Sequence, residues 1–310
     1  PGGPGQSEGV AQGAAADVRR RIAELADRGV QALILDLRSN GGGLLDEAVS
    51  TAGLFFDSGP VVQVRSKADT QFPADTDGKT AYAGPLVVFV NRLSASASEI
   101  VAAVLQDYGR ALVVGDSHTF GKGTVQKHSP LRDTVGGGAM VVTISQFYRV
   151  NGSTTQFQGV TPDLDLPGLA EVSDLGEQSL DYALPPTKVE PTPYPHLDQV
   201  APYLERLRLA SQARVQQSQV FQKIAKEIEE QQAHQDRRGK IAFKQPDAKA
   251  NGGKGKQNGP GASADPYLQE CLAIGADYVQ LRNGRPLGAV SVVETAPPDA
   301  KEGKRADPEP

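Results

Sequence analysis

Apolar positions along the first part of the chain repeat with helical spacing and then run continuously. From Asp17 to Gly29 they fall on one helical face, which predicts a helix that ends at the glycine. The run QALILDL at 31–37 is apolar throughout and of strand length, which favours a central strand buried on both faces. A glycine-rich turn at 39–43 follows, and helical spacing resumes from Leu45.

The same succession of strand and helix continues to about Pro167. Further strands are predicted at 61–65, 85–90 and 111–116, and a helix is predicted directly after the second of these, in SASASEIVAAVLQDYG. The segments GTVQ and 140–150 flank the glycines at 136–138 and predict an antiparallel hairpin. Alternating strands and helices followed by a hairpin indicate an α/β domain.

Composition changes beyond this core, and six regions are expected. They are a flexible N-terminus (1–13), the core (14–186), a helical appendage (187–235), a low-complexity linker (236–264), a short helical segment (265–295) and a disordered tail (296–310). The appendage is rich in Gln, Glu, Lys and Arg with sparse apolar positions. It is interpreted as a helical layer packed on the core, with a partner-binding helix as the alternative.

Charge and cysteine content exclude several classes of function. The formal net charge is −5, which gives no basis for nucleic acid as a partner. Cys271 is the single cysteine, so neither an intramolecular disulfide nor a zinc knuckle can be built from cysteines. No apolar run approaches about 20 residues, so membrane association is not indicated. The chain starts without Met or a signal peptide, and we expect a fragment or a processed form.

Ser96 lies among small residues at the junction between the strand at 85–90 and the helix that follows it. A hydroxyl at such a junction can point into a cleft, where the N–H groups of the first helical turn have no partner within the helix. These donors favour a developing oxyanion. The simpler alternative is that Ser94, Ser96 and Ser98 only cap the helix.

A serine nucleophile needs a group that accepts its proton, and Lys122 is the stronger candidate. It lies between two glycines in the loop TFGKGTVQ, and a lysine can act as a base where burial disfavours its charged form. Most single lysines are instead solvated surface charges. His118 and His128 flank the same loop, so a Ser–His pair stays an alternative.

The glycines at 41–43 could present backbone N–H groups to an oxyanion and allow substrate to approach closely. A tight turn without a ligand is the alternative. Neither a phosphate-binding P-loop nor a dinucleotide fingerprint fits their spacing, so nucleotide binding is not expected.

Three motifs in order, LILDLRSNGGGLLDEAV, GPLVVFVNRLSASASEIVAAVLQDYGRALVVGD and TFGKGTVQ, resemble the C-terminal processing peptidases, in particular their tail-specific protease branch. The resemblance is dense from about residue 17 to Pro167 and weaker as far as Asp265. It implies a crotonase/ClpP-like protease core of βα units with an antiparallel hairpin, followed by a helical C-terminal appendage.

The resemblance also implies roles for individual residues. Ser96, the middle serine of SASASE, is similar to the family nucleophile, and Lys122, the lysine of FGKG, is similar to its base. Gln126 would orient the lysine, and Asp107 would support the site from the end of the nucleophile's helix. The oxyanion donors would be the N–H groups of Ala97 and of Gly42 or Gly43.

The implied activity is a serine endopeptidase that cleaves unfolded or C-terminally tagged proteins in the periplasm, with no cofactor or metal and with a possible adaptor protein as partner. Family members carry a PDZ module and a further strand before the first helix, and we expect neither in this chain. The loop before Lys122 holds one residue more than usual, which could bring His118 near the site. The alternatives are a peptide-binding fragment without catalysis and a crotonase-like acyl-CoA enzyme.

Overall fold

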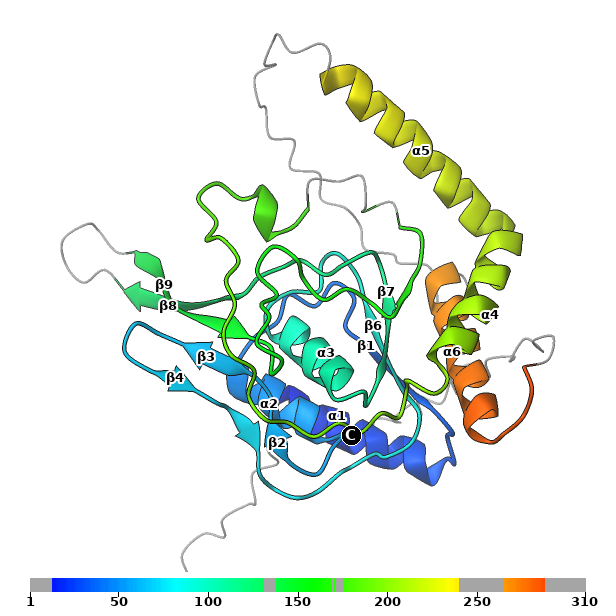
Figure 1. Ribbon diagram of the computed structural model, residues 1–310, viewed down its shortest axis with the longest axis horizontal. Helices are drawn as coiled ribbons and strands as arrows, with labels where there is room; N and C mark the ends of the chain where they lie inside the picture. Colours follow the sequence, from blue (N-terminus) through cyan, green and yellow to red (C-terminus); the bar gives the residue numbers. More distant parts are fainter. Residues whose placement is uncertain (1–12, 131–137, 169, 171–174, 240–264, 288–310) are drawn as a thin grey trace, which may run out of the picture.

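The computed structural model describes residues 13–130, 138–168, 170, 175–239 and 265–287. A four-stranded parallel sheet lies at the centre, in the order β1-β6-β7-β10, and helices cover both of its faces (Figure 1). Its strands are β1 (Leu33–Asp36), β6 (Leu86–Val90), β7 (Leu112–Gly115) and β10 (Leu164–Asp165). The predicted α/β fold class is confirmed.

Alternating side chains of the central strand β6 divide the apolar core in two. Leu86, Val88 and Val90 point into a cluster with the helices that precede β7, whereas Val87 and Phe89 point into a cluster with the C-terminal helices. The first group of helices is α1 (Ala14–Asp27), α2 (Leu45–Gly53) and α3 (Ala97–Asp107). The second is α4 (Leu204–Gln217) and α6 (Pro266–Arg282).

Strand β1 is not the central strand that its continuous apolar run predicted. It lies at the edge of the sheet and pairs only with β6 in the described part of the chain, and Ile34 and Leu35 are half-buried. The run is apolar because helices cover both faces of the strand: Leu33 belongs to one core cluster, and Ile34 packs against the other. An apolar run therefore indicates covered faces and says nothing of covered edges.

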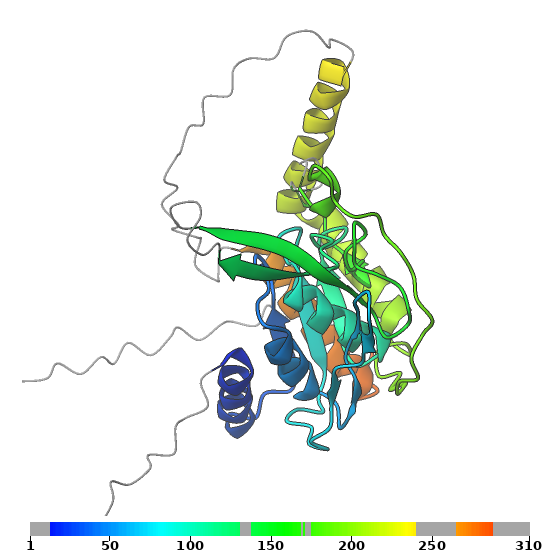
Figure 2. The same ribbon diagram turned by 90° about the vertical axis from the view of Figure 1, so that its left-hand side faces the viewer.

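The predicted hairpin is confirmed as β8 (Thr124–Pro130) paired with β9 (Ala139–Tyr148), and it projects from the body of the molecule (Figure 2). The two strands belong to an antiparallel sheet of order β4-β3-β9-β8, with β3 (Gln63–Arg65) and β4 (Thr70–Gln71). There are also a two-stranded sheet, β2 (Gly59–Pro60) with β5 (Ala74–Asp75), and a short 3-10 helix (Glu177–Ser179). Residues 131–137, with two of the predicted turn glycines, lie outside the described residues.

The predicted helical appendage (187–235) packs, for part of its length, together with the short helical segment predicted at 265–295. Helices α4 and α6 pack on each other, α6 packs on β1 and β6, and Leu207, Ile274 and Tyr278 are fully buried there. Helix α5 (Gln219–Gly239) follows after an extended residue at Ser218 and points away from the body (Figures 1 and 2). Most of the predicted linker, the N-terminus and the predicted tail lie outside the described residues.

Candidate active site

Ser96 lies where the loop after β6 turns into α3, as predicted. It is half-buried, whereas Ser94 and Ser98 are almost fully buried. Ser94 is a structural residue, because its hydroxyl donates to the carbonyl of Leu37 at 2.8 Å. The backbone of Ser96 has φ 57° and ψ −115°, a region that non-glycine residues seldom occupy. Such a conformation at a helix start is typical of a functional turn that its surroundings hold in place.

Glu99, in the first turn of α3, was not singled out from the sequence. Its side chain is completely buried, and its two oxygens accept hydrogen bonds from the N–H groups of Ser96 (2.7 Å), Gly121 (2.7 Å) and Lys122 (2.9 Å) and from the Thr119 hydroxyl (2.6 Å). One carboxylate thus fixes both the serine turn and the lysine loop. Burial raises the pKa of Glu99 to about 7, and the donors oppose that rise.

The loop that carries Lys122 packs against the serine turn. The N–H of Phe120 donates to the carbonyl of Ser94 at 2.9 Å, and Lys122 is half-buried. The Lys122 amine donates to Oε1 of Gln126 at 3.2 Å, so the predicted neighbour of the lysine lies beside it. Among the hydrogen bonds of the described residues, none joins this amine directly to the Ser96 hydroxyl.

The glycine loop lies against the same turn from the other side. The N–H of Ala95 donates to the carbonyl of Asn40 at 3.0 Å. Gly42 has φ 90°, and a Cβ on it would lie 2.9 Å from Cβ of Ser96 and 2.7 Å from the nitrogen of Ala97, so only glycine fits there. The N–H of Gly42 donates to Oδ1 of Asn40 at 3.0 Å. Of the two predicted oxyanion donors, Gly42 therefore already has a hydrogen-bond partner for its N–H.

Asp107 and His118 do not meet at Ser96. Asp107 ends α3, about 16 Å from its start at 1.5 Å per residue, and binds the Arg149 guanidinium at 2.6 Å and the Asn151 amide at 2.8 Å. Nδ1 of His118 contacts the carbonyl of Thr119 at 2.7 Å, and its ring lies against Arg92. Burial lowers the pKa of His118. These contacts give His118 no hydrogen bond to Ser96 in the described part of the chain.

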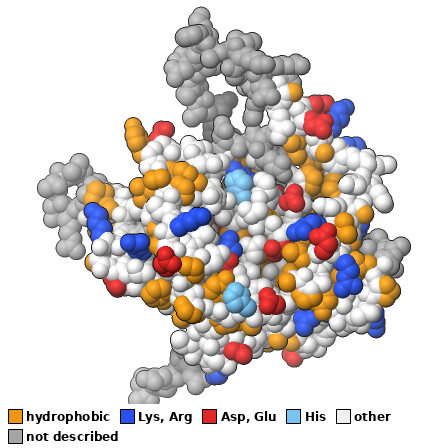
Figure 3. Space-filling model, in the orientation of Figure 1, with side chains coloured by type: hydrophobic (Ala, Val, Ile, Leu, Met, Phe, Trp, Pro, Cys, Tyr) orange, Lys and Arg blue, Asp and Glu red, His pale blue; other side chains and the backbone are white. Residues whose placement is uncertain are grey.

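An apolar cavity of about 300 Å³ opens beside the glycine loop. Its lining includes Val18, Leu35, Leu44, Ala48 and Val101, together with Gly42 and Ala97. A cavity with such a lining can take up an apolar side chain. On the face drawn in Figure 3, acidic and basic side chains are intermixed rather than gathered in a basic area that would attract nucleic acid.

The family model described as peptidase family S41 matches residues 7–166, slightly more than half of the chain. The chain belongs to peptidase family S41. A second model, the C-terminal domain of tail specific protease, matches residues 170–241, the region of α4 and α5. The predicted membership among C-terminal processing peptidases of the tail-specific branch is thereby confirmed.

Several proteins similar to this S41 chain are named as tail-specific or C-terminal processing proteases. It is 44% identical over 184 residues to the tail-specific protease of Haemophilus influenzae, covering 57% of this chain and 26% of the relative. It is 39% identical over 158 residues to carboxyl-terminal-processing peptidase 2, chloroplastic, of Arabidopsis thaliana, covering 50% and 30%. The solved structure of the photosystem II D1 C-terminal processing protease shares 38% identity, with 49% and 39% covered and a TM-score of 0.44. The chain thus spans about a quarter to a third of these curated relatives.

None of the helices in the described residues is both long enough and apolar enough to cross a membrane. Within the same residues, no group of three or more His, Cys, Asp or Glu side chains could hold a metal ion.

Proposed function

We propose that the chain is the catalytic part of a serine endopeptidase in which Ser96 is the nucleophile and Lys122 the general base. Ser96 Oγ attacks the scissile carbonyl while the neutral Lys122 amine takes its proton. The N–H groups of Ala97 and Gly43 stabilise the oxyanion, and Gln126 orients the amine. The protonated amine then gives its proton to the leaving amine, and water resolves the acyl-enzyme.

The observation that carries this proposal is the Glu99 carboxylate, which accepts the backbone N–H groups of both Ser96 and Lys122. A buried carboxylate that joins two half-buried polar residues from separate loops is expected where their relative position matters for chemistry. A cap at the start of a helix needs no such bond to the lysine loop. The helix-cap alternative for Ser96 therefore explains less of the geometry.

The substrates follow from the family. Matches to tail-specific and carboxyl-terminal-processing peptidases support protein substrates that are recognised through unstructured C-termini. The apolar cavity beside Gly42 would accept an apolar side chain next to the scissile bond. A periplasmic location and an adaptor protein remain part of the proposal by family resemblance. Membership of family S41 removes the reason for an acyl-CoA enzyme.

The proposal is tested by incubating the chain with an unfolded protein whose C-terminus is apolar and by following fragments with mass spectrometry. Ser96→Ala should abolish cleavage and leave the melting temperature within a few degrees of the parent, because only one hydroxyl is lost. Ser50→Ala, at an exposed serine of α2, is the matched control and should cleave at the parental rate. Binding of the protein without any cleavage by the parent would instead support the peptide-binding alternative.

A further inference from the structure

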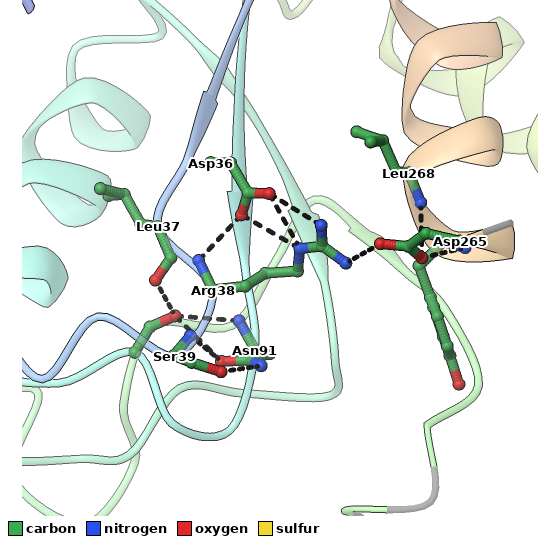
Figure 4. A network of polar contacts seen from close by, with 9 residues as sticks. Asp36, Leu37, Arg38, Ser39, Asn91, Asp265 and Leu268 are labelled. Carbon is green, nitrogen blue, oxygen red and sulfur yellow. Dashed lines mark hydrogen bonds and ion pairs between the residues drawn. The ribbon is translucent and has the colours of Figure 1, made fainter. Parts of the chain in front are cut away.

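Arg38 lies between β1 and the glycine loop and binds two carboxylates (Figure 4). One is two residues away along the chain and the other is 227 residues away. Its Nε and Nη2 donate to the Asp36 carboxylate at 2.7 to 3.1 Å, and its Nη1 donates to Oδ2 of Asp265 at 2.7 Å. The guanidinium carbon lies 4.1 Å from the centre of the Phe89 ring. The side chain is thus held on three sides, with 22% of it exposed.

Asp265 holds Arg38 and the start of α6 at the same time. Its Oδ1 accepts the N–H groups of Tyr267 at 3.0 Å and Leu268 at 3.1 Å, which makes it the N-cap of α6. Its Oδ2 accepts the Arg38 guanidinium. Helix α6 is packed on β1 and β6, so the position of Asp265 is fixed by the core. The ion pair joins positions 227 residues apart.

Beyond Arg38 the chain enters the glycine loop through two further anchored residues. The N–H of Ser39, a residue with φ 56°, donates to Oδ1 of Asn91 at 2.8 Å, and the Asn91 amide donates back to the Ser39 hydroxyl at 3.2 Å (Figure 4). The carbonyl of Asn40 accepts the N–H of Ala95, next to the nucleophile. Gly42 then contacts the serine turn directly.

We infer that Asp265 is a positioning residue for the acyl transfer, because through Arg38 it fixes where the glycine loop leaves β1 and so where that loop presents its N–H groups to the oxyanion. This inference rests on the proposed function. It gives α6, at the C-terminal end of the described chain, a role in catalysis besides covering the sheet. A displacement of about 1 Å in such a loop is enough to slow catalysis by up to about 100-fold.

The test separates this role from general stability by using two substitutions that keep the cap of α6. Asp265→Asn retains an oxygen for Tyr267 and Leu268 but turns the acceptor of Arg38 into an uncharged amide, and Asp265→Ser caps the helix but is too short to reach Arg38. Glu205→Gln is the control, because Glu205 is an exposed carboxylate in the first turn of α4 that pairs only with its neighbour Arg208 among the described residues.

Two measurements are made on each variant of the full chain. Amide hydrogen exchange is followed for the peptide that contains residues 38–44, and kcat and KM are determined for an unfolded protein substrate. Both Asp265 variants should exchange faster in this peptide and lose about 10- to 100-fold in kcat, with KM changed less than threefold. Glu205→Gln should match the parent in both measurements.

The inference would be overturned if residues 38–44 exchanged their amide hydrogens at the parental rate in both Asp265 variants. It would also be overturned if kcat fell only as far as the folded fraction falls. Because hydrogen exchange needs no turnover, it reports on the inference even if the parent cleaves nothing. An inactive parent would contradict the proposed function alone. Arg38→Met combined with Asp265→Asn should be no slower than Arg38→Met by itself, since both substitutions remove the same contact between Arg38 and Asp265.

Discussion

Ser96, the proposed nucleophile, is held in an unfavourable backbone conformation by its surroundings. Its φ of 57° carries a cost of the order of 1–3 kcal/mol, which surrounding contacts have to offset. The Glu99 carboxylate supplies one of these contacts through the Ser96 N–H and is itself buried with four donors around it. Ser96 and the buried Glu99 therefore form a single hydrogen-bonded unit.

Glu99→Gln tests this unit through the pH dependence of stability. Burial raises the folded-state pKa of Glu99 to about 7 from 4.5, so the carboxyl group stays protonated to a higher pH in the folded chain than in the unfolded chain. Glu99 thus stabilises the fold below about pH 4.5, and that contribution is lost as pH rises to about 7. Its size is of the order of 3 kcal/mol.

The measurement is urea unfolding at pH 5 and pH 7.5. The parent should lose most of this contribution between the two pH values, whereas Glu99→Gln should vary less with pH. At pH 7.5 the variant should be less stable, because an amide cannot accept all four donors that the carboxylate accepts. Equal pH dependence in parent and variant would show that Glu99 does not titrate in this range.

Lys122→Arg distinguishes a lysine base from a histidine base. A guanidinium stays protonated and cannot accept the serine proton, so this variant should have no activity at any pH. In the parent, kcat/KM should rise toward alkaline pH, because only the neutral amine acts as a base. His118→Ala should keep the parental profile, since His118 contacts Arg92 and Thr119 rather than Ser96. An inactive His118→Ala with an active Lys122→Arg would reverse the assignment.

At the scale of elements, α3 links the site to a buried ion pair at its far end. Asp107 is 5% exposed and Arg149 14% exposed, and Asn151 also donates to Asp107. Burial raises the pKa of Asp107, and the guanidinium opposes that rise. The pair fixes the end of α3 to the segment after β9, so it supports the Ser96 turn through a rigid helix.

Asp107→Ala should therefore lower stability by about 3–5 kcal/mol, because it leaves the Arg149 guanidinium buried without its partner. Activity should fall only as far as the folded fraction falls. Urea unfolding and cleavage rates, measured on the same samples, decide this. Arg149→Ala is the matched variant with a comparable expected loss. A fully folded Asp107→Ala without activity would indicate a direct role in the chemistry.

At the scale of the whole molecule, two helical layers share one sheet. The residues of β6 alternate between the two core clusters, so neither layer is complete without the sheet. Helix α6 closes the second face with Cys271, Ile274, Tyr278 and Leu281, all nearly inaccessible to solvent. The C-terminal helices are therefore part of the fold that carries the site.

Ile274→Ala should cost about 2–5 kcal/mol, because it opens a cavity between α6 and the sheet. Leu272→Ala is the control on the same helix, where the side chain is 38% exposed, and it should cost clearly less. Thermal unfolding should show a single transition that shifts down in Ile274→Ala. A separate, earlier transition in Ile274→Ala, with the main transition unchanged, would mean that α6 unfolds independently.

Local patterns in the sequence were sufficient for the helices, for strands β1, β6 and β7 and for the hairpin, but not for the two-residue strand β10, and the family motifs supplied three candidate residues of the site. Ser96, Lys122 and Gln126 lie in short motifs, and the loops that carry them follow strands whose apolar runs are easy to recognise. Spacing within one strand or one loop is a local property, so it can be predicted without the fold. The edge position of β1 could not be predicted, because apolarity reports covered faces and not hydrogen-bonded edges.

Only the tertiary structure decided which distant residues meet. Glu99 sits in S-x-x-E, a capping-box pattern that a sequence can show, but its bonds to the Lys122 loop depend on how β6 and β7 place two loops side by side. Arg38 and Asp265 are 227 positions apart, and no local spacing relates them. The sequence by itself therefore determined most of the elements and the candidate side chains, whereas packing of α6 and α3 on the sheet determined how those side chains are held.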